Sequence, residues 1–169
     1  MKLKKPKVFK KYFNSFLDSR GFLSAIDLEN LEKKLQIKFE YQLVSLSEKK
    51  YTFRGFHFQK KPKAQNKLVI VHSGKILDFV VQIDSPLSSQ VKSFELSAGD
   101  VIAIPHDYAH GFLSLTNNVI IQYLLDNKFS AKSYSGFNAN SFIKEKFPSR
   151  KITISKKDKS LKDKILIDD

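Results

Sequence analysis

The sequence predicts a mainly β protein, an antiparallel β-sandwich or barrel with one or two short helices. Most of the chain consists of short apolar runs separated by Gly, Asn or Asp turns, which is typical of antiparallel sheets. Only one stretch has a clear helical period. At 169 residues the chain is expected to form one domain with a buried core. We divide it into an N-terminal arm (1–25), a barrel (about 38–130) and a C-terminal tail (131–169).

The helical stretch is IDLENLEKKLQ, residues 26–36. Leu28, Leu31 and Leu35 recur at the spacing of one helix face. Asp27 precedes them and can cap the first turn with its side chain. The sequence therefore predicts a short amphipathic helix between the arm and the barrel.

The predicted strands follow at short intervals. They are FEYQLVSL (39–46), FRGFHFQ (53–59), KLVIV (67–71), ILDFVVQI (76–83), VKSFEL (91–96), VIAI (101–104), GFLSL (111–115) and VIIQYLL (119–125). The tail is more polar and less regular, with KITIS (151–155) as a possible last strand. No internal repeat divides the chain.

The composition favours an anionic small ligand. The formal charge is +13, carried by 27 lysines and three arginines spread along the chain. Such charge attracts polyanions, but no helix-turn-helix, RNP or zinc-finger pattern is present, so nucleic acid is not the expected partner. A lysine-rich composition without functional meaning explains the charge equally well.

The cysteine content and the lack of long apolar runs indicate the cellular compartment. With no cysteine, the chain has no disulfide, thiol nucleophile or thiolate metal site. No apolar run approaches the length of a membrane span, and the basic N-terminus lacks the apolar segment of a signal peptide. We expect a cytoplasmic enzyme that does not bind membranes.

The stretch FRGFHFQ combines one of three arginines with one of four histidines. Strict alternation puts His57 on one face of the strand and Arg54 on the other, with Phe56 and Phe58. Glycine inside a strand often marks a bulge, so Gly55 can turn Arg54 toward the face of His57. Alone, the stretch is also compatible with a surface strand.

The stretch GDVIAIPHDYAHGF (99–112) has a second functional pattern. A turn, a buried strand, Pro105 and a short loop lead to His110, which is how many cupin barrels place a polar residue inside an apolar cavity. The His-x-His cluster of metal-binding cupins is absent, and two lone histidines make a poor metal site. The expected fold is a metal-free cupin or jelly-roll barrel.

Six segments, from about residue 18 to 161, resemble the dTDP-4-dehydrorhamnose 3,5-epimerase family in order and spacing. One segment, FEYQLVSLSEKKYTFRGFHFQ (39–59), looks like the family's strand running into R-G-[LF]-H-[FY]-Q. The other five segments are DSRGFLS (18–24), QNKLVIVHSGKILDFVVQID (65–84), ELSAGDVIAIPHDYAHGFLSL (95–115), QYLLDNKFS (122–130) and ISKKDKSL (154–161).

The resemblance implies epimerisation beside the C4 ketone of a nucleotide-linked 6-deoxy sugar, without cofactor. His57 matches the family's base, a role that suits imidazole, and Asp158 matches its carboxylate partner. Lys67 matches the cation that stabilises the enolate oxygen. Tyr123 matches the acid that returns a proton from the opposite face.

The resemblance also implies a substrate-binding set. Arg20 and Arg54 match positions that bind the diphosphate, and guanidinium forks suit that role. His110 and Asp78 match a second pair that shapes the pocket around the ketone. The remaining candidates are Gln42, Gln59 and Phe129, the last as a stacking surface for the base.

Departures from the family pattern concern the substrate more than the reaction. Asp107 stands where glycine is usual, Lys128 and Phe129 replace paired tyrosines, and GFNAN (136–140) replaces W-N-D. The sugar can be another deoxysugar or a heptose, inverted at C3, C5 or both. A related 3,4-ketoisomerase and a non-catalytic sugar-binding barrel are the alternatives. The expected partners are a dTDP-linked sugar and a second copy of the chain, because family members are usually homodimers.

Overall fold

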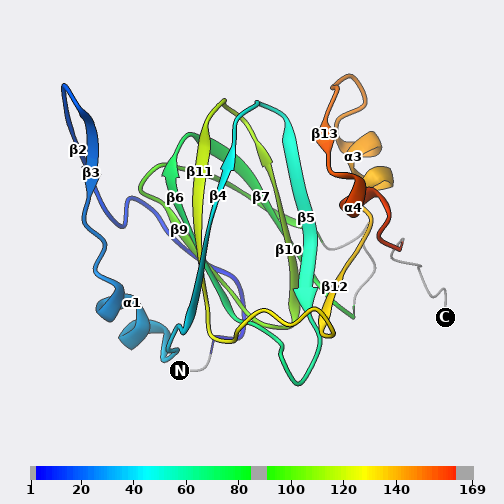
Figure 1. The fold of residues 1–169 in the computed structure, drawn as a ribbon, viewed down its shortest axis with the longest axis horizontal. Helices are drawn as coiled ribbons and strands as arrows, with labels where there is room; N and C mark the ends of the chain where they lie inside the picture. The colour runs from blue at the N-terminus through cyan, green and yellow to red at the C-terminus, as the bar shows by residue number, and fades with distance from the viewer. Residues whose placement is uncertain (1–2, 85–90, 163–169) are drawn as a thin grey trace.

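The computed structural model describes residues 3–84 and 91–162 (Figure 1). Two antiparallel sheets face each other and enclose the core. The mainly β, cupin-like fold class predicted from the sequence is confirmed. No helix among the described residues is long and apolar enough to cross a bilayer.

The first sheet has the strand order β1-β9-β6-β11-β4. Its strands are β1 (Lys7–Phe9), β9 (Val101–Ile104), β6 (Lys67–Ser73), β11 (Val119–Leu125) and β4 (Tyr41–Ser47). Strand β1 adds the N-terminal arm to the sheet edge, with Val8 opposite Ile102. The arm is therefore part of the fold rather than an appendage.

The second sheet has the order β12-β5-β10-β7-β8, and β13 pairs with β5 in parallel. Its strands are β12 (Tyr134–Gly136), β5 (Thr52–Gln59), β10 (Tyr108–Ser114), β7 (Lys75–Gln82), β8 (Lys92–Ser97) and β13 (Thr153–Ile154). The predicted last strand is thus present, but only as a short β13.

Three apolar clusters hold the layers together. One lies between the sheets and includes Ile76, Phe112 and Ile121. A second packs helix α1 (Leu28–Leu35) on the first sheet. A third packs helix α3 (Asn140–Lys146) on the second sheet. Helices therefore cover an outer face of each sheet, and the inner strands β6, β9 and β10 are largely buried.

The predicted helix is confirmed as α1. Asp27 caps it, accepting a hydrogen bond from the backbone N–H of Asn30 at 3.0 Å. The tail, read as irregular, contains α3 and a single-turn helix α4 (Lys156–Lys159). The arm contains a hairpin of β2 (Ser15–Asp18) and β3 (Gly21–Ser24) that projects from the barrel (Figure 1).

Candidate active site

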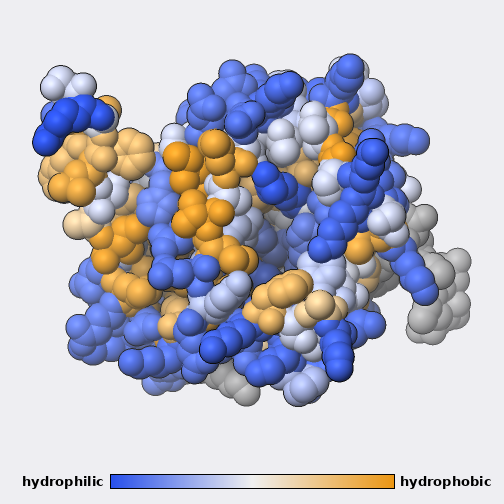
Figure 2. All heavy atoms as spheres, viewed as in Figure 1, coloured by the Kyte–Doolittle hydropathy of each residue, from blue (hydrophilic) through white to orange (hydrophobic). Residues whose placement is uncertain are grey.

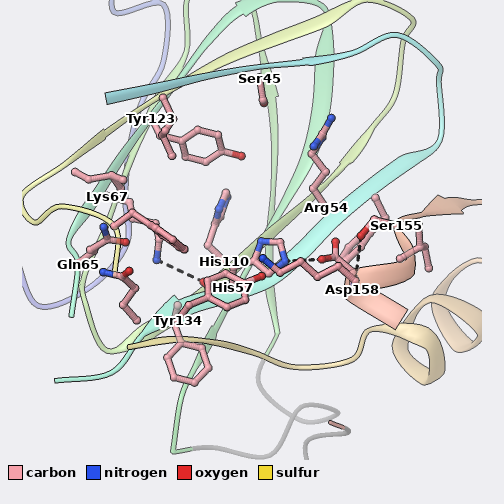
Figure 3. A pocket seen from close by; sticks show the side chains of 18 of the residues that line it. Ser45, Arg54, His57, Gln65, Lys67, His110, Tyr123, Tyr134, Ser155 and Asp158 are labelled. Carbon is pink, nitrogen blue, oxygen red and sulfur yellow. Dashed lines mark hydrogen bonds and ion pairs between the residues drawn. The ribbon is translucent and has the colours of Figure 1, made fainter. Parts of the chain in front are cut away.

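A cavity of about 540 Å³ opens between the two sheets (Figure 3). Its wall includes side chains from β4, β5, β6, β10 and β11, and from the segment that forms β13 and α4. All four residues predicted to be catalytic line it: His57, Lys67, Tyr123 and Asp158. Of the predicted binding residues, Arg54, Gln59, His110 and Phe129 line it as well.

His57 and Asp158 form a hydrogen-bonded pair at one wall. His57 Nε2 lies 2.9 Å from Asp158 Oδ1. Asp158 is buried, and its other carboxylate oxygen accepts a 3.4 Å bond from the backbone N–H of Gly55. Burial alone would raise the pKa of Asp158, but the hydrogen bond and charge of His57, with the Gly55 and Ser155 contacts, hold that pKa below its usual value.

Helix α4 places Asp158 at this wall. Ser155 is its N-cap, and the hydroxyl of Ser155 accepts a 3.0 Å bond from the backbone N–H of Asp158. A capping residue followed three positions later by a carboxylate is a recognised helix-start pattern. The pattern fixes the carboxylate in the first turn, where it faces His57.

A shift in register brings Arg54 to the same face as His57. His110 pairs with His57 and Phe112 with Arg54, so two residues of β5 face a single residue of β10. This is the bulge predicted at Gly55, and it is confirmed. Phe56 is consequently buried in the cluster under α3, and Phe58 joins that cluster while also lining the cavity.

Arg54 lines the cavity and is exposed there. Its guanidinium donates to Ser47 Oγ at 3.1 Å and to the backbone carbonyl of Leu46 at 3.0 Å. Figure 3 shows its head near the hydroxyl of Tyr123 and close to Ser45. Arg54 therefore adds positive charge to the part of the cavity where Tyr123 lies.

Lys67 enters the cavity from the start of β6. It is 7% exposed, and its ammonium donates to the backbone carbonyl of His57 at 3.4 Å. Burial lowers the pKa of Lys67 to about 8, although the charge of Asp126 acts in the opposite direction. Near neutral pH the side chain is therefore mainly protonated and acts as a buried cation.

Tyr123 projects from β11 on the opposite sheet (Figure 3). Burial raises its pKa, as does the charge of Asp78, while Arg54 and Ser45 act against the increase. The phenol is therefore protonated at neutral pH. Its ring lies edge-on to His110, with centroids 6.0 Å apart.

His110 and Asp78 form a second, fully buried pair. His110 Nε2 lies 2.6 Å from Asp78 Oδ2. Burial raises the pKa of Asp78, and the charge and hydrogen bond of His110 only partly oppose this. His110 reaches the cavity, whereas Asp78 lies behind it and does not line the wall.

The other predicted binding residues differ in position. The amide of Gln59 bonds the carbonyl of Lys63 at 2.6 Å and the backbone N–H of Ser130 at 2.7 Å, so it shapes the loops around the cavity. Gln42 lies outside the cavity and accepts from Gln122 at 2.9 Å, because Leu43 and Ser45 occupy the inward face of β4. Arg20 also lies outside, paired with Asp18 near the tip of the hairpin.

Several residues that line the cavity were not predicted from the sequence. Leu43, Ser45, Tyr134 and Lys157 all line the wall. Alternation along β4 puts Leu43, Ser45 and Ser47 on one face, so this pattern could have predicted Leu43 and Ser45. Tyr134 follows a turn-rich segment that carries no local signal of a site. No cluster of three or more possible metal ligands occurs among the residues that the structure describes.

Comparison with known proteins identifies close relatives. The family model described as dTDP-4-dehydrorhamnose 3,5-epimerase matches residues 2–164. The enzyme of that name from Sinorhizobium fredii is 34% identical over 127 residues, which span 72% of this chain and 65% of that protein. The one from Salmonella typhimurium is 33% identical over 124 residues, covering 70% of this chain and 68% of the relative.

Solved structures agree over a longer range. The dTDP-4-dehydrorhamnose 3,5-epimerase of Bacillus anthracis, crystallised with TDP and PPi bound, has a TM-score of 0.76 and 33% identity. That match covers 94% of this chain and 93% of the Bacillus chain. The enzyme of that name from Sulfolobus tokodaii has a TM-score of 0.71 and 30% identity, over 88% and 85% of the two chains.

Proposed function

Because the chain belongs to the dTDP-4-dehydrorhamnose 3,5-epimerase family, we propose that it epimerises a nucleotide-linked 4-keto-6-deoxy sugar without a cofactor. One observation carries the proposal. His57 and Tyr123 face the same cavity from opposite sheets (Figure 3). Inversion of a carbon centre requires removal of a proton from one face and its return to the other, and these two groups suit the two tasks.

The first step is proton abstraction by His57. With Nε2–H donated to Asp158 at 2.9 Å, Nδ1 is the nitrogen free to accept a proton. The electron pair of the broken C–H bond moves into the adjacent C4 carbonyl and forms an enolate. Asp158, ionised because its pKa is held low, stabilises the imidazolium that results.

The enolate oxygen needs a cation in a water-poor site, and Lys67 supplies it. Its ammonium lies at the same end of the cavity as His57, bonded to the His57 carbonyl. Tyr123 then donates its phenolic proton to the carbanion from the opposite face. The His110–Asp78 pair lies on the same sheet as His57, and the His110 ring contacts the Tyr123 ring from that sheet.

The substrate class follows from the family and from the charge of the cavity. A dTDP-linked sugar brings a diphosphate, and Arg54, Lys67 and Lys157 are cations in the wall. Phe129, which is 51% exposed at the rim, offers a face on which a nucleobase can stack. A ketoisomerase would not need an acid across the cavity from its base, so the position of Tyr123 favours epimerisation.

Hydrogen exchange tests this function directly. The protein is incubated with dTDP-4-keto-6-deoxyglucose in deuterated water, and the product is examined by NMR and mass spectrometry. Deuterium at C3, C5 or both is expected, together with inverted configuration at the labelled carbon. A shift of the ketone to C3 would instead identify an isomerase, and absence of exchange with several nucleotide sugars would support a binding protein.

The exposed apolar surface supports a homodimer. Figure 2 shows apolar side chains gathered over β4 and the hairpin. Leu17 is 81% exposed, Leu23 73% and Val44 68%, and such a patch marks an interaction surface. A second copy packed there would bring Arg20 of one hairpin near the partner's cavity. Sedimentation should give the mass of a dimer, and Leu17→Lys with Leu23→Lys should give a monomer.

A further inference from the structure

Lys67 is a buried cation without a carboxylate in direct contact. Its side chain is 7% exposed, and its ammonium donates to the neutral backbone carbonyl of His57 at 3.4 Å. In the described part of the chain, no carboxylate lies within ion-pair distance of this ammonium. Burying a charge is costly unless another group compensates it. A group that keeps Lys67 charged must therefore act from beyond direct contact.

Asp126 is the carboxylate that acts on Lys67. Lys67 pairs with Leu125 across β6 and β11, so Asp126 is the next residue along the neighbouring strand's chain. On its other side Lys67 pairs with Ile104, which is apolar and supplies no charge. Burial lowers the pKa of Lys67 to about 8, and the charge of Asp126 acts against a larger decrease.

The other charged and titratable groups around Lys67 do not take this part. They are Arg54 and His57 on β5, Asp78 on β7, His110 on β10, Tyr123 on β11, Tyr134 on β12, Lys157 and Asp158 on α4, His106 after β9, Lys128 after β11 and Glu40 before β4. Of the carboxylates, Asp158 and Asp78 are bonded to histidines, and Glu40 is exposed across β11 from Lys67. Among these described residues, Asp126 is the carboxylate left to compensate the ammonium.

Asn66 fixes the carboxylate of Asp126 in place. The backbone N–H of Asn66 donates to Asp126 Oδ1 at 2.8 Å, and its side-chain amide donates to Oδ2 at 2.6 Å. The amide oxygen of Asn66 accepts a 3.0 Å bond from the backbone N–H of His106. Because Asn66 immediately precedes Lys67, one residue ties the anion to the strand that carries the cation.

Gln65 and Asn127 join the same two segments. The amide of Gln65 donates to the carbonyl of Asn127 at 2.8 Å, and the amide of Asn127 donates to the carbonyl of Ala64 at 2.9 Å. Gln65 is buried and lies at the same end of the cavity as Lys67 (Figure 3). These bonds hold the start of β6 against the end of β11, so the separation of the carboxylate from the ammonium is fixed.

We propose that Asp126, held by Asn66, is a positioning residue that keeps Lys67 charged and leaves its N–H donors available to the enolate oxygen, an inference that rests on the proposed function. A carboxylate in direct contact would bind the ammonium and compete with the substrate. A carboxylate fixed beside the strand stabilises the positive charge through space and occupies none of its donors. Asp126 therefore acts on the reaction only through Lys67.

Titration of the lysine side chains by NMR tests this pairing independently of activity. The full-length protein is labelled with carbon-13 at the lysine Cε, and the signal missing from Lys67→Met is that of Lys67. Asp126→Asn removes the charge, so the titration midpoint of Lys67 should move to lower pH by about one pH unit. Asn66→Ala keeps the charge but loosens the carboxylate, and should move the midpoint by less. Asp107→Asn removes an exposed carboxylate and should leave it unchanged.

The pH profile of epimerisation tests the consequence for the reaction. The kcat/KM of Asp126→Asn should match wild type near pH 6 and be about fivefold lower at pH 8, because the alkaline limb follows the midpoint of Lys67. Asp126→Glu retains the charge and should restore most of the rate at pH 8. A loss of equal size at every pH would give Asp126 a structural role only and would overturn the proposal.

The NMR titration also separates this proposal from the proposed function. An unchanged Lys67 midpoint in Asp126→Asn, or an equal change in Asp107→Asn, would overturn the role of Asp126 while leaving epimerisation intact. A wild-type protein that exchanges no deuterium with any nucleotide sugar would overturn the proposed function, and with it the role of Asp126 in the reaction, even where the midpoint of Lys67 responds to Asp126→Asn. Thermal unfolding confirms that the variants are folded.

Discussion

His57 and Asp158 are separated by 101 residues in sequence, yet His57 Nε2 lies 2.9 Å from Asp158 Oδ1. The contact depends on two local structural features, the bulge in β5 and the Ser155 N-cap of α4. It fixes the orientation of the imidazole and leaves its other nitrogen for the substrate. The carboxylate also keeps a negative charge beside the base.

Asp158→Asn tests the contribution of that charge. An amide can hold the ring but cannot stabilise imidazolium, so kcat should fall by about 10²- to 10⁴-fold with little change in KM. Steady-state kinetics of the epimerisation measures this. Asp107→Asn, which neutralises an exposed carboxylate, serves as the control. A loss of only a few fold in Asp158→Asn would show that the pair is structural.

Tyr123→Phe separates the two proton transfers. Removal of the hydroxyl leaves His57 able to exchange the substrate proton but removes the acid on the opposite face. We expect solvent deuterium to enter with retained configuration faster than inverted product forms. Tyr12→Phe loses a hydroxyl that bonds the carbonyl of Asp27, far from the cavity, and should behave as wild type. Equal loss of exchange and inversion in Tyr123→Phe would contradict its role as the acid.

The lowered pKa of Lys67 leads us to expect a fall in activity at alkaline pH. Burial lowers its pKa to about 8, so the charged form that stabilises the enolate disappears as the pH rises through that value. The rate kcat/KM should decline above about pH 8, and Lys67→Met should be slow and lack this decline. A profile of Lys67→Met that keeps the same alkaline limb would assign the limb to another group.

The same group should lower the stability of the folded protein. The pKa of Lys67 is lower in the folded state than the usual 10.5, so folding disfavours its charged form. This cost is full below about pH 8 and disappears as the pH rises toward 10.5. Lys67→Met should therefore raise Tm at pH 7, and its advantage should shrink by pH 10. An unchanged Tm difference across that range would contradict the buried charge.

Local patterns predicted the barrel, whereas most of its site residues were implied by the family resemblance. Strict alternation would place Arg54 and His57 on opposite faces of β5. Only an extra residue in the strand can place both on one face, and this predicted the bulge. Gln42 was chosen for its hydrogen-bonding amide, but alternation along β4 puts it on the outer face, bonded to Gln122. The pattern of inward and outward residues was the better guide there.

Other features lacked a usable local signal. The contact of His57 with Asp158 depends on the whole fold, and only the family resemblance suggested it. Helix α3 has no side-chain cap, and its apolar residues are too few to reveal a helical period. Helix α4 did carry a signal, since Ser155 and Asp158 have the spacing of a capping box. The contact of Lys157 with the Tyr134 ring joins two polar tail segments that sequence periodicity could not connect.

Gly55 permits the close crossing of β5 and β10 beneath the site. Its φ is +136°, and a Cβ there would lie 2.4 Å from Gly111 Cα and 2.8 Å from the carbonyl oxygen of His110. Both neighbours are backbone and cannot move aside separately. Gly55→Ala should lower the free energy of unfolding by about 3 kcal/mol or more, combining backbone strain with overpacking.

Gly21 provides the matched control for this effect. Its φ is +132°, but a Cβ added there meets nothing within 4 Å. Gly21→Ala therefore carries the backbone strain without the clash and should cost about 1 kcal/mol. Urea denaturation of both variants measures the difference. Equal losses of unfolding free energy in the two variants would mean that glycine is required at position 55 for its backbone conformation and not for its contact with Gly111. The pairing of β5 with β10 would then tolerate a side chain beside His57.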